Sequence, residues 1–385
     1  MQPTTKTVLL FFIALITLPA CNQDKSTSDS IAIGTTESIY SATLKEERKV
    51  LVHVPEGYNQ SDSVKYPVLY LLDGDAHFKS VVGLMHQLSS VNGNSVCPRM
   101  VIVAIPNTNR TRDLTPTHVV SKKADSTFFK SSGGGENFTA FIAEELIPFI
   151  DRKYPVTQKR TLVGHSLGGL MVINTLLKHS DLFDKYICID PSLWWNNFES
   201  LQAYEVAVEQ NELNGKSLFI GIANTIRMDT LTALEDTTES TDHFRAIHRF
   251  IKTLKQTKTH RLDWQAKYYP DETHGSVPLI SEYDAFHFLF RKIPIAMGLS
   301  QLKQFEGKYK HQFEKGEDSF LDIVANENFL VITETWRGRE MVFSPVGESD
   351  FYSFENDFPV TFKKNANGGI SQLVAFERDV WEKVE

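Results

Sequence analysis

The chain has 385 residues and a formal net charge of −8, and 41% of its residues are hydrophobic. These values are typical of a globular protein and exclude the strongly basic surface on which nucleic-acid binding depends. The length is sufficient for one large domain and a smaller one. We therefore expect a protein of two folded domains that has no nucleic-acid partner.

The first 20 residues have the pattern of a secretory signal peptide. Lys6 precedes an apolar run over residues 8–18, which is too short to span a bilayer. The run ends in Leu18-Pro19-Ala20-Cys21, which resembles the lipobox of bacterial lipoproteins, where the cysteine becomes the lipidated N-terminus. We expect export to the bacterial cell envelope (periplasmic or outer-membrane face), a membrane anchor at Cys21 and a polar tether over residues 21–30. Ordinary secretion is the alternative.

From residue 31 onward, predicted strands and helices alternate. Continuous apolar runs at 68–72 and 100–105 predict strands that are covered on both faces. The other strands are expected at 31–44, 49–54, 186–189, 217–223 and 262–269, and helices at 78–88, 137–150, 201–213, 238–254 and 277–290. This alternation predicts an α/β fold with a mostly parallel central sheet over residues 31–295. Its reactive turns are expected at the C-terminal ends of the strands.

Residues 160–170 predict a strand, a sharp turn and a helix with Ser166 at the apex. An apolar and β-branched run leads into Gly164-His165-Ser166-Leu167-Gly168, and an apolar helical pattern follows. Such a turn forces the serine into strained backbone geometry, so small residues are needed two positions to either side. A plain strand-to-helix turn is the alternative, but the flanking elements are those that a nucleophilic serine requires. We predict Ser166 to be a nucleophile.

His274 is the predicted base. In hydrolases with such a turn the histidine follows the last strand of the sheet, and His274 lies between the strand expected at 262–269 and the final helix. A histidine in a solvated loop is the alternative. His165 is expected to pack or to form a hydrogen bond at the turn, and His287 to pack within the final helix. His243 and His248 have a spacing that fits no usual pair of metal ligands, so they are expected to be surface or packing residues.

The acid that would orient His274 is expected in the loop after the strand at 217–223. This loop contains Asp229, Glu235 and Asp236, and Asp229 is our first choice because it lies nearest the strand. Asp236 is the alternative acid, although it also has the pattern of a helix N-cap. A serine–histidine dyad without an acid stays possible.

Two backbone N–H groups are expected to form an oxyanion hole. One belongs to Leu167, directly after the serine, and the other to the loop that follows the strand at 68–72. In that loop Gly74 allows the backbone to turn, which makes the N–H of Asp75 our candidate. An ordinary strand-ending turn at Asp73-Gly74 is the alternative.

Five motifs, taken together and in order, resemble the "Putative esterase" family of α/β-hydrolases, which includes esterase D, ferric-enterobactin esterases and mycolyltransferases. They are Tyr70-Leu71-Leu72-Asp73-Gly74, residues 107–116, Gly164-His165-Ser166-Leu167-Gly168-Gly169, Asp190-Pro191-Ser192-Leu193-Trp194-Trp195 and His274-Gly275-Ser276-Val277-Pro278. The resemblance covers roughly residues 31–292 and implies an α/β-hydrolase fold with Ser166 as nucleophile and His274 as base. The mycolyltransferases take an oxyanion donor from the position of Asp75. The long loop after Ala223 departs from many relatives, so their acid is not carried over.

The sequence therefore predicts a serine carboxylesterase that works through an acyl-enzyme, with a small-molecule ester as substrate and no cofactor. A siderophore-type ester, or a carbohydrate or phenolic ester, is expected. An acyltransferase with the same triad and a non-catalytic binding protein on a hydrolase scaffold are the alternatives.

Substrate selection is expected in the loop 107–135 and in the segment Trp194-Trp195. Arg110 and Arg112 either recognise an anionic or catecholate-bearing substrate or pair with a neighbour such as Asp113. The tryptophans either form an acyl or aromatic wall or act as a buried brace.

Beyond residue 292 the pattern changes to short alternating runs separated by turn residues such as Asn367-Gly368-Gly369. This predicts a small antiparallel β domain over residues 300–385 without an obvious catalytic group. Cys97 and Cys188, the two cysteines besides Cys21, are too few for a disulfide framework or a metal site, and Cys188 is expected to be a buried free thiol.

Overall fold

A computed structural model of the chain describes residues 31–57, 64–120, 128–210, 213–257, 261–312, 318–375 and 379–384. The predicted signal peptide (1–20), the tether (21–30) and Cys21 lie outside the described residues. Among the helices that are described, none is both long and apolar enough to span a bilayer.

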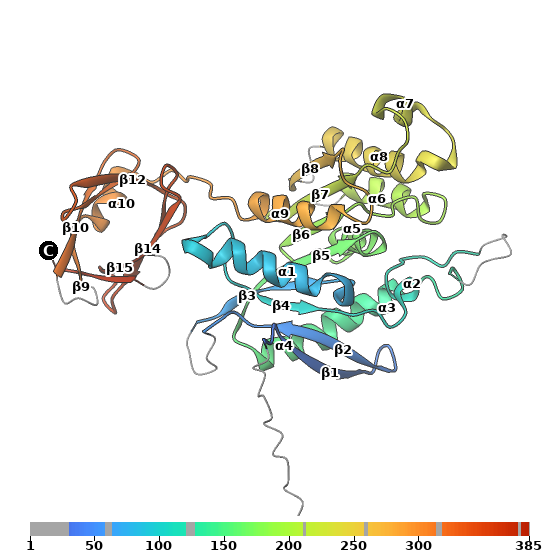
Figure 1. Ribbon diagram of the computed structural model, residues 1–385, viewed down its shortest axis with the longest axis horizontal. Coiled ribbons are helices and arrows are strands. Elements are labelled where there is room, and N and C mark those ends of the chain that lie inside the picture. The colour runs from blue at the N-terminus through green and yellow to red at the C-terminus, as the bar shows by residue number, and fades with distance from the viewer. Residues whose placement is uncertain are drawn as a thin grey trace, which may run out of the picture. The chain divides into compact units, whose positions relative to one another are not determined.

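The larger part of the fold is built on an eight-stranded sheet with the order β1-β2-β4-β3-β5-β6-β7-β8 (Figure 1). The strands are β1 (Thr35–Ser41), β2 (Glu46–His53), β3 (Tyr66–Leu71), β4 (Val101–Ala104), β5 (Val156–His165), β6 (Lys185–Ile189), β7 (Ser217–Ala223) and β8 (Asp263–Tyr269). The pairs β1–β2 and β2–β4 are antiparallel, and every later pair is parallel. The α/β-hydrolase fold expected from the sequence is thus confirmed.

Apolar runs in the sequence become the strands that are covered on both faces. All four residues of β4 are buried, and so are most of those in β3, β6 and β7. By contrast, β8 lies at the edge and alternates between exposed and half-buried residues. In the register of β5 and β6, His165 pairs with Ile189, so the two strands end side by side. The residues that follow these two strands are therefore neighbours.

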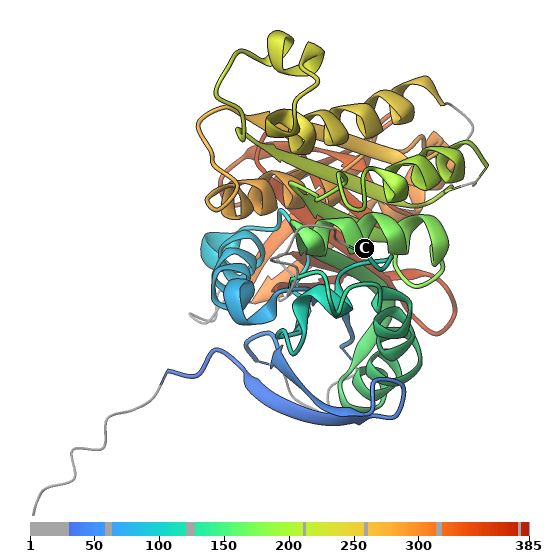
Figure 2. The same cartoon turned by 90° about the vertical axis from the view of Figure 1, so that its right-hand side faces the viewer.

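Helices cover both faces of this sheet, as Figure 2 shows. On one face α1 (Gly74–Ser89) and α9 (Val277–Leu289) supply Phe78, Val81 and Phe286 to one apolar core. The other face carries α3 (Gly135–Ala140), the π-helical segment η2 (Phe141–Leu146), α4 (Ile147–Lys153), α5 (Leu167–Lys178), α6 (Glu199–Gln210) and α8 (Asp242–Gln256). Shorter segments connect them: η1 (Val91–Gly93), α2 (Arg110–Asp113), α7 (Thr230–Glu235) and η3 (Glu239–Thr241). Each helix predicted from its apolar face is present.

The C-terminal part is a closed antiparallel barrel of eight strands with its own apolar core. Two short helical segments, α10 (Leu299–Leu302) and η4 (Lys303–Phe305), precede it. The strands are β9 (Gly307–Gln312), β10 (Asp318–Ala325), β11 (Leu330–Glu334), β12 (Arg339–Pro345), β13 (Asp350–Ser353), β14 (Phe358–Lys364), β15 (Ile370–Ala375) and β16 (Asp379–Lys383). The pair β9–β16 closes the barrel, so each of its described strands is paired on both sides. The small antiparallel β domain is confirmed, and its closure is a feature that the alternating pattern alone did not predict.

Candidate active site

Ser166 stands at the turn between β5 and α5 in a backbone conformation that residues other than glycine rarely adopt, with φ 60° and ψ −116°. The turn is tight enough that a Cβ on Gly164 would lie 2.4 Å from the carbonyl oxygen of Gly168. The Ser166 N–H donates to the carbonyl of Ile189 at 2.9 Å, which ties the turn to the end of β6. The sequence therefore folds locally as expected, with the hydroxyl-bearing residue at the C-terminal edge of the sheet.

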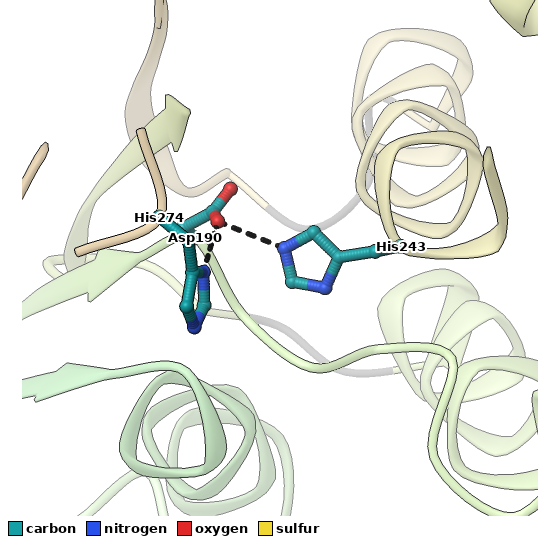
Figure 3. Close-up of side chains that lie close together, drawn as sticks. All are labelled: Asp190, His243 and His274. Atoms are coloured by element: carbon teal, nitrogen blue, oxygen red, sulfur yellow. Dashed lines mark hydrogen bonds and ion pairs between the residues drawn. The ribbon is translucent and has the colours of Figure 1, made fainter. Parts of the chain in front are cut away.

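His274 lies in the loop between β8 and α9, and its ring faces a buried carboxylate. Its Nδ1 is 2.5 Å from Oδ2 of Asp190, whose side chain has no exposed surface (Figure 3). Asp190 directly follows β6 with φ 41°. Its other oxygen, Oδ1, accepts the N–H of Ala223 at 3.0 Å. A buried acid therefore orients the imidazole ring that was predicted to be a base.

The sequence placed this acid at Asp229 or, alternatively, Asp236, and the structure corrects both positions. The carboxylate of Asp229 accepts the backbone N–H of Thr232 and caps α7. Asp236 follows α7 as its C-cap, and its carboxylate accepts hydrogen bonds from the hydroxyls of Thr238 and Thr241, whereas the N-cap of the next segment, η3, is Thr238. Both carboxylates are thus used in local turns within the loop after β7.

Asp190 was missed although its position carried a signal. It is the first polar residue after the apolar strand β6, which is hydrogen-bonded directly to β5, the strand that leads to Ser166. The strand β7, whose loop was predicted to supply the acid, lies one strand further from β5. A carboxylate at the end of the neighbouring strand reaches the histidine loop equally well.

A second histidine, His243 in the first turn of α8, also contacts this acid. Its Nε2 lies 2.9 Å from Oδ2 of Asp190, so the same carboxylate oxygen is shared by two imidazoles (Figure 3). Its Nδ1 accepts the indole N–H of Trp194 at 3.1 Å. The prediction that His243 is a surface or packing residue is therefore wrong. His248, which lies five residues further along α8, packs against Phe244 as expected.

The environment of Asp190 keeps its carboxylate ionised. Burial raises the pKa of this group, but hydrogen bonds from His243, His274 and the Ala223 N–H outweigh burial and hold the pKa well below its ordinary value. The ring of His165 lies 4.5 Å from that of His274, centroid to centroid. Burial, with smaller contributions from His274 and His77, lowers the pKa of His165 to about 4. His165 is therefore neutral near pH 7, while Asp190 is negatively charged.

The hydroxyl of Ser166 is hydrogen-bonded to the hydroxyl of Ser192, with 3.3 Å between the two oxygens. Ser192 lies two residues after Asp190, and its N–H donates to the carbonyl of Ser166 at 3.0 Å. A serine Oγ turns readily about a single bond, and hydrogen bonds of catalytic groups often tighten only when substrate binds.

The two predicted oxyanion donors belong to the first turns of helices. Leu167 is the first residue of α5, and Asp75 is the second residue of α1, so neither N–H has an acceptor within its helix. Asp73 is the N-cap of α1, and its left-handed backbone conformation, with φ 53°, makes the turn into this helix. The carboxylate of Asp73 receives Nε and Nη2 of Arg110 at 2.6 and 2.9 Å, and the same Nη2 lies 3.3 Å from the carbonyl of His165. Arg110 thus links the turn before α1 to the strand that leads to the serine.

The remaining residues predicted to bind substrate have partners within the protein. Arg112 donates to Asp113 and forms a two-pronged ion pair with Glu46, at 2.6 and 3.0 Å. Trp195 is fully buried, and its indole N–H donates to the carbonyl of Thr117. Of the alternatives left open by the sequence, the structure favours ion pairing for both arginines and a brace for Trp195. Trp194 is half-buried and holds His243.

Comparison with known proteins places these observations in a family. The family model "Putative esterase" matches residues 41–271. Ferri-bacillibactin esterase BesA of Bacillus subtilis is 32% identical over 212 residues, covering 51% of this chain and 72% of the relative. A siderophore enterobactin esterase of Emericella nidulans is 28% identical over 240 residues, covering 54% and 77%. The crystal structure of an IroE-like serine hydrolase from Shewanella oneidensis matches with a TM-score of 0.63 and 33% identity, covering 70% of this chain and 84% of that one.

Proposed function

Because the chain belongs to the "Putative esterase" family and is a serine esterase of the α/β-hydrolase fold, we propose that Ser166, His274 and Asp190 form its catalytic triad. The observation that carries this proposal is the 2.5 Å contact between Nδ1 of His274 and the fully buried carboxylate of Asp190. A carboxylate in this position fixes the ring with its Nε2 lone pair free to act as a base. The strained serine at the neighbouring strand end supports the same assignment.

The reaction proceeds in two steps, the acylation and the deacylation of Ser166. Oγ of Ser166 bonds to the ester carbonyl carbon, Nε2 of His274 takes the hydroxyl proton, and the carbonyl π electrons move to the oxygen. The N–H groups of Leu167 and Asp75 stabilise this oxyanion. The oxyanion then re-forms the carbonyl, the bond to the alcohol oxygen breaks, and His274 returns the proton to the departing alcohol. In the second step water bonds to the acyl carbon while Nε2 of His274 takes a proton from it. The bond between this carbon and Oγ of Ser166 then breaks, His274 gives its proton to Oγ, and the carboxylic acid leaves.

We propose a siderophore-type ester as the substrate class. The proposal is supported by two relatives whose names describe siderophore esterases, one acting on ferri-bacillibactin and one on enterobactin. Since Arg110 and Arg112 are paired with carboxylates, we assign them to holding the loop 107–116 against the site rather than to direct recognition of the substrate.

The test combines covalent labelling with turnover of the purified protein. A fluorophosphonate should label wild type once per chain, and substitution Ser166→Ala should abolish labelling and lower kcat/KM for p-nitrophenyl acetate by about 10³-fold or more. The variant His274→Ala should also lose fluorophosphonate labelling and turnover of p-nitrophenyl acetate, because Ser166 then lacks its base. Product analysis with a tri-catecholate trilactone should show ring-opened acids. A folded wild type that neither labels nor turns over would refute the triad, and esterase activity without trilactone hydrolysis would refute only the substrate class.

A further inference from the structure

An unbroken series of hydrogen bonds runs from a tryptophan to the proposed catalytic acid. The indole N–H of Trp194 lies 3.1 Å from Nδ1 of His243, and Nε2 of His243 lies 2.9 Å from Oδ2 of Asp190. That oxygen also lies 2.5 Å from Nδ1 of His274. Two histidines from different elements, the first turn of α8 and the loop before α9, thus meet at one oxygen atom (Figure 3).

The hydrogen-bonding capacity of Trp194 determines the state of His243. An indole N–H can only donate, so Nδ1 of His243 has to be an acceptor and carries no proton. The single proton of this neutral ring is therefore on Nε2, where it points at Asp190. A protonated ring would place two N–H groups against each other at Trp194.

We propose that His243, held in this tautomer by Trp194, is a positioning residue for the acid Asp190. This inference rests on the triad proposed above. The N–H of His243 fixes Oδ2 of Asp190 in the plane where His274 needs its acceptor, and it draws negative charge away from that oxygen. The ring acts on the reaction only through Asp190. Unlike an arginine or a lysine at the same place, a neutral imidazole adds no charge that would repel the imidazolium formed on His274.

Asp190, His243 and His274 together also have the composition of a metal site, because their possible ligand atoms lie within 4.8 Å of one another. A metal ion on Nε2 of His243 would require the proton to move to Nδ1, against the indole N–H of Trp194. The donor arrangement therefore fits a hydrogen bond better than coordination. Inhibition by a stoichiometric amount of Zn²⁺ that is lost in His243→Gln would overturn the positioning role in favour of a metal site.

The decisive variants are His243→Leu and His243→Gln. Leucine removes the donor, whereas the glutamine amide can place an N–H near the position of Nε2. With leucine, kcat should fall about tenfold with KM nearly unchanged, because the value of one hydrogen bond to the acid is lost. Without this donor the carboxylate of Asp190 carries more negative charge beside the imidazolium that forms on His274, so the acidic limb of the kcat/KM profile should move to higher pH. Glutamine should restore most of both properties.

The titratable groups that face His274 are Asp190, His165 and His243, and His77 faces His165 from α1. The matched control is His248→Gln, which makes the same exchange five residues further along α8 and should leave the pH profile unchanged. If His243→Leu loses thermal stability but keeps the wild-type pH profile and kcat, the role is only structural and the proposal is wrong.

A second measurement needs neither a substitution nor activity. Nitrogen-15 resonances of the histidine rings in the wild type should show the ring proton of His243 on Nε2, which faces Asp190, and none on Nδ1, which faces Trp194. A ring protonated on Nδ1 would overturn the inference even in an active enzyme. Conversely, a protein that shows this tautomer but fails to label with the fluorophosphonate would refute the triad and leave the hydrogen-bond series intact.

Discussion

Asp190 and Asp113 are equally hidden in the α/β part of the chain, yet their partners differ in kind. Their side chains are 0% and 2% exposed, and each accepts hydrogen bonds from two basic side chains. Asp113, at the end of α2, receives Nη1 of Arg48 at 2.6 Å and Nε of Arg112 at 2.7 Å. Asp190 receives two imidazoles instead. Burial and the number of hydrogen bonds therefore do not distinguish the two sites.

The partners differ in whether they can exchange a proton near neutral pH. A guanidinium keeps its proton throughout this range, whereas an imidazole takes and releases one. Arg48 belongs to β2 and is 1% exposed, and its guanidinium also lies over the rings of Phe138 and Phe141. The cluster at Asp113 thus holds elements together as a fixed ion-pair network. The cluster at Asp190 can hold the ring of His274 in place and also support proton transfer by that ring.

The largest expected effect comes from Asp190→Asn. The imidazolium formed on His274 would lose its counter-ion and the ring its correct tautomer, so kcat/KM should fall about 10³- to 10⁴-fold. Steady-state turnover of p-nitrophenyl acetate measures this loss. The control Asp229→Asn removes the carboxylate that caps α7 and should keep activity within about twofold. Full activity in the Asp190 variant together with loss in the Asp229 variant would restore the acid predicted from the sequence.

Asp113→Asn should have the opposite balance of effects. The buried guanidinium of Arg48 would lose its charged partner, which should lower the free energy of unfolding by about 3 kcal/mol. The folded molecules should keep a kcat close to that of the wild type, because no group of this cluster contacts Ser166, His274 or Asp190 in the described part of the chain. Chemical unfolding followed by tryptophan fluorescence measures the first quantity and initial rates the second. A large loss of kcat without a loss of stability would show that the two clusters are coupled.

The sequence was most informative where a site residue is fixed by local structure. Ser166 lies in a strand–turn–helix whose small residues and apolar runs are contiguous, and His274 is placed by the last strand alone. The acid depends on which strand ends come together, and this is a tertiary property. Asp229 and Asp190 both follow apolar strands, and only the order of the sheet separates them.

The position of His243 could not be predicted in the same way. It lies in an amphipathic helix 53 residues beyond its partner Asp190, and its role depends on the contact that the first turn of α8 makes with this residue in the folded protein. Trp194 was noted as part of a motif, but the sequence left a wall and a brace open. In the structure its indole N–H is a donor to that histidine.

The smallest expected effect distinguishes the two clusters by pH rather than by activity. The pKa of His165 in the folded protein is about 4, below the ordinary value of 6.5, chiefly because the ring is buried. Between these values the unfolded chain binds more protons than the folded one, so the free energy of unfolding should rise with pH and fall on acidification. We expect this contribution to be about 1.5 kcal/mol between pH 6.5 and pH 5, and to vanish in His165→Gln. The guanidinium partners of Asp113 do not titrate in this range, so between pH 5 and pH 6.5 Asp113→Asn should be less stable than the wild type while keeping the wild-type slope. If the free energy of unfolding has the same slope against pH in the wild type and in His165→Gln, the imidazole of His165 does not cause the loss of stability on acidification.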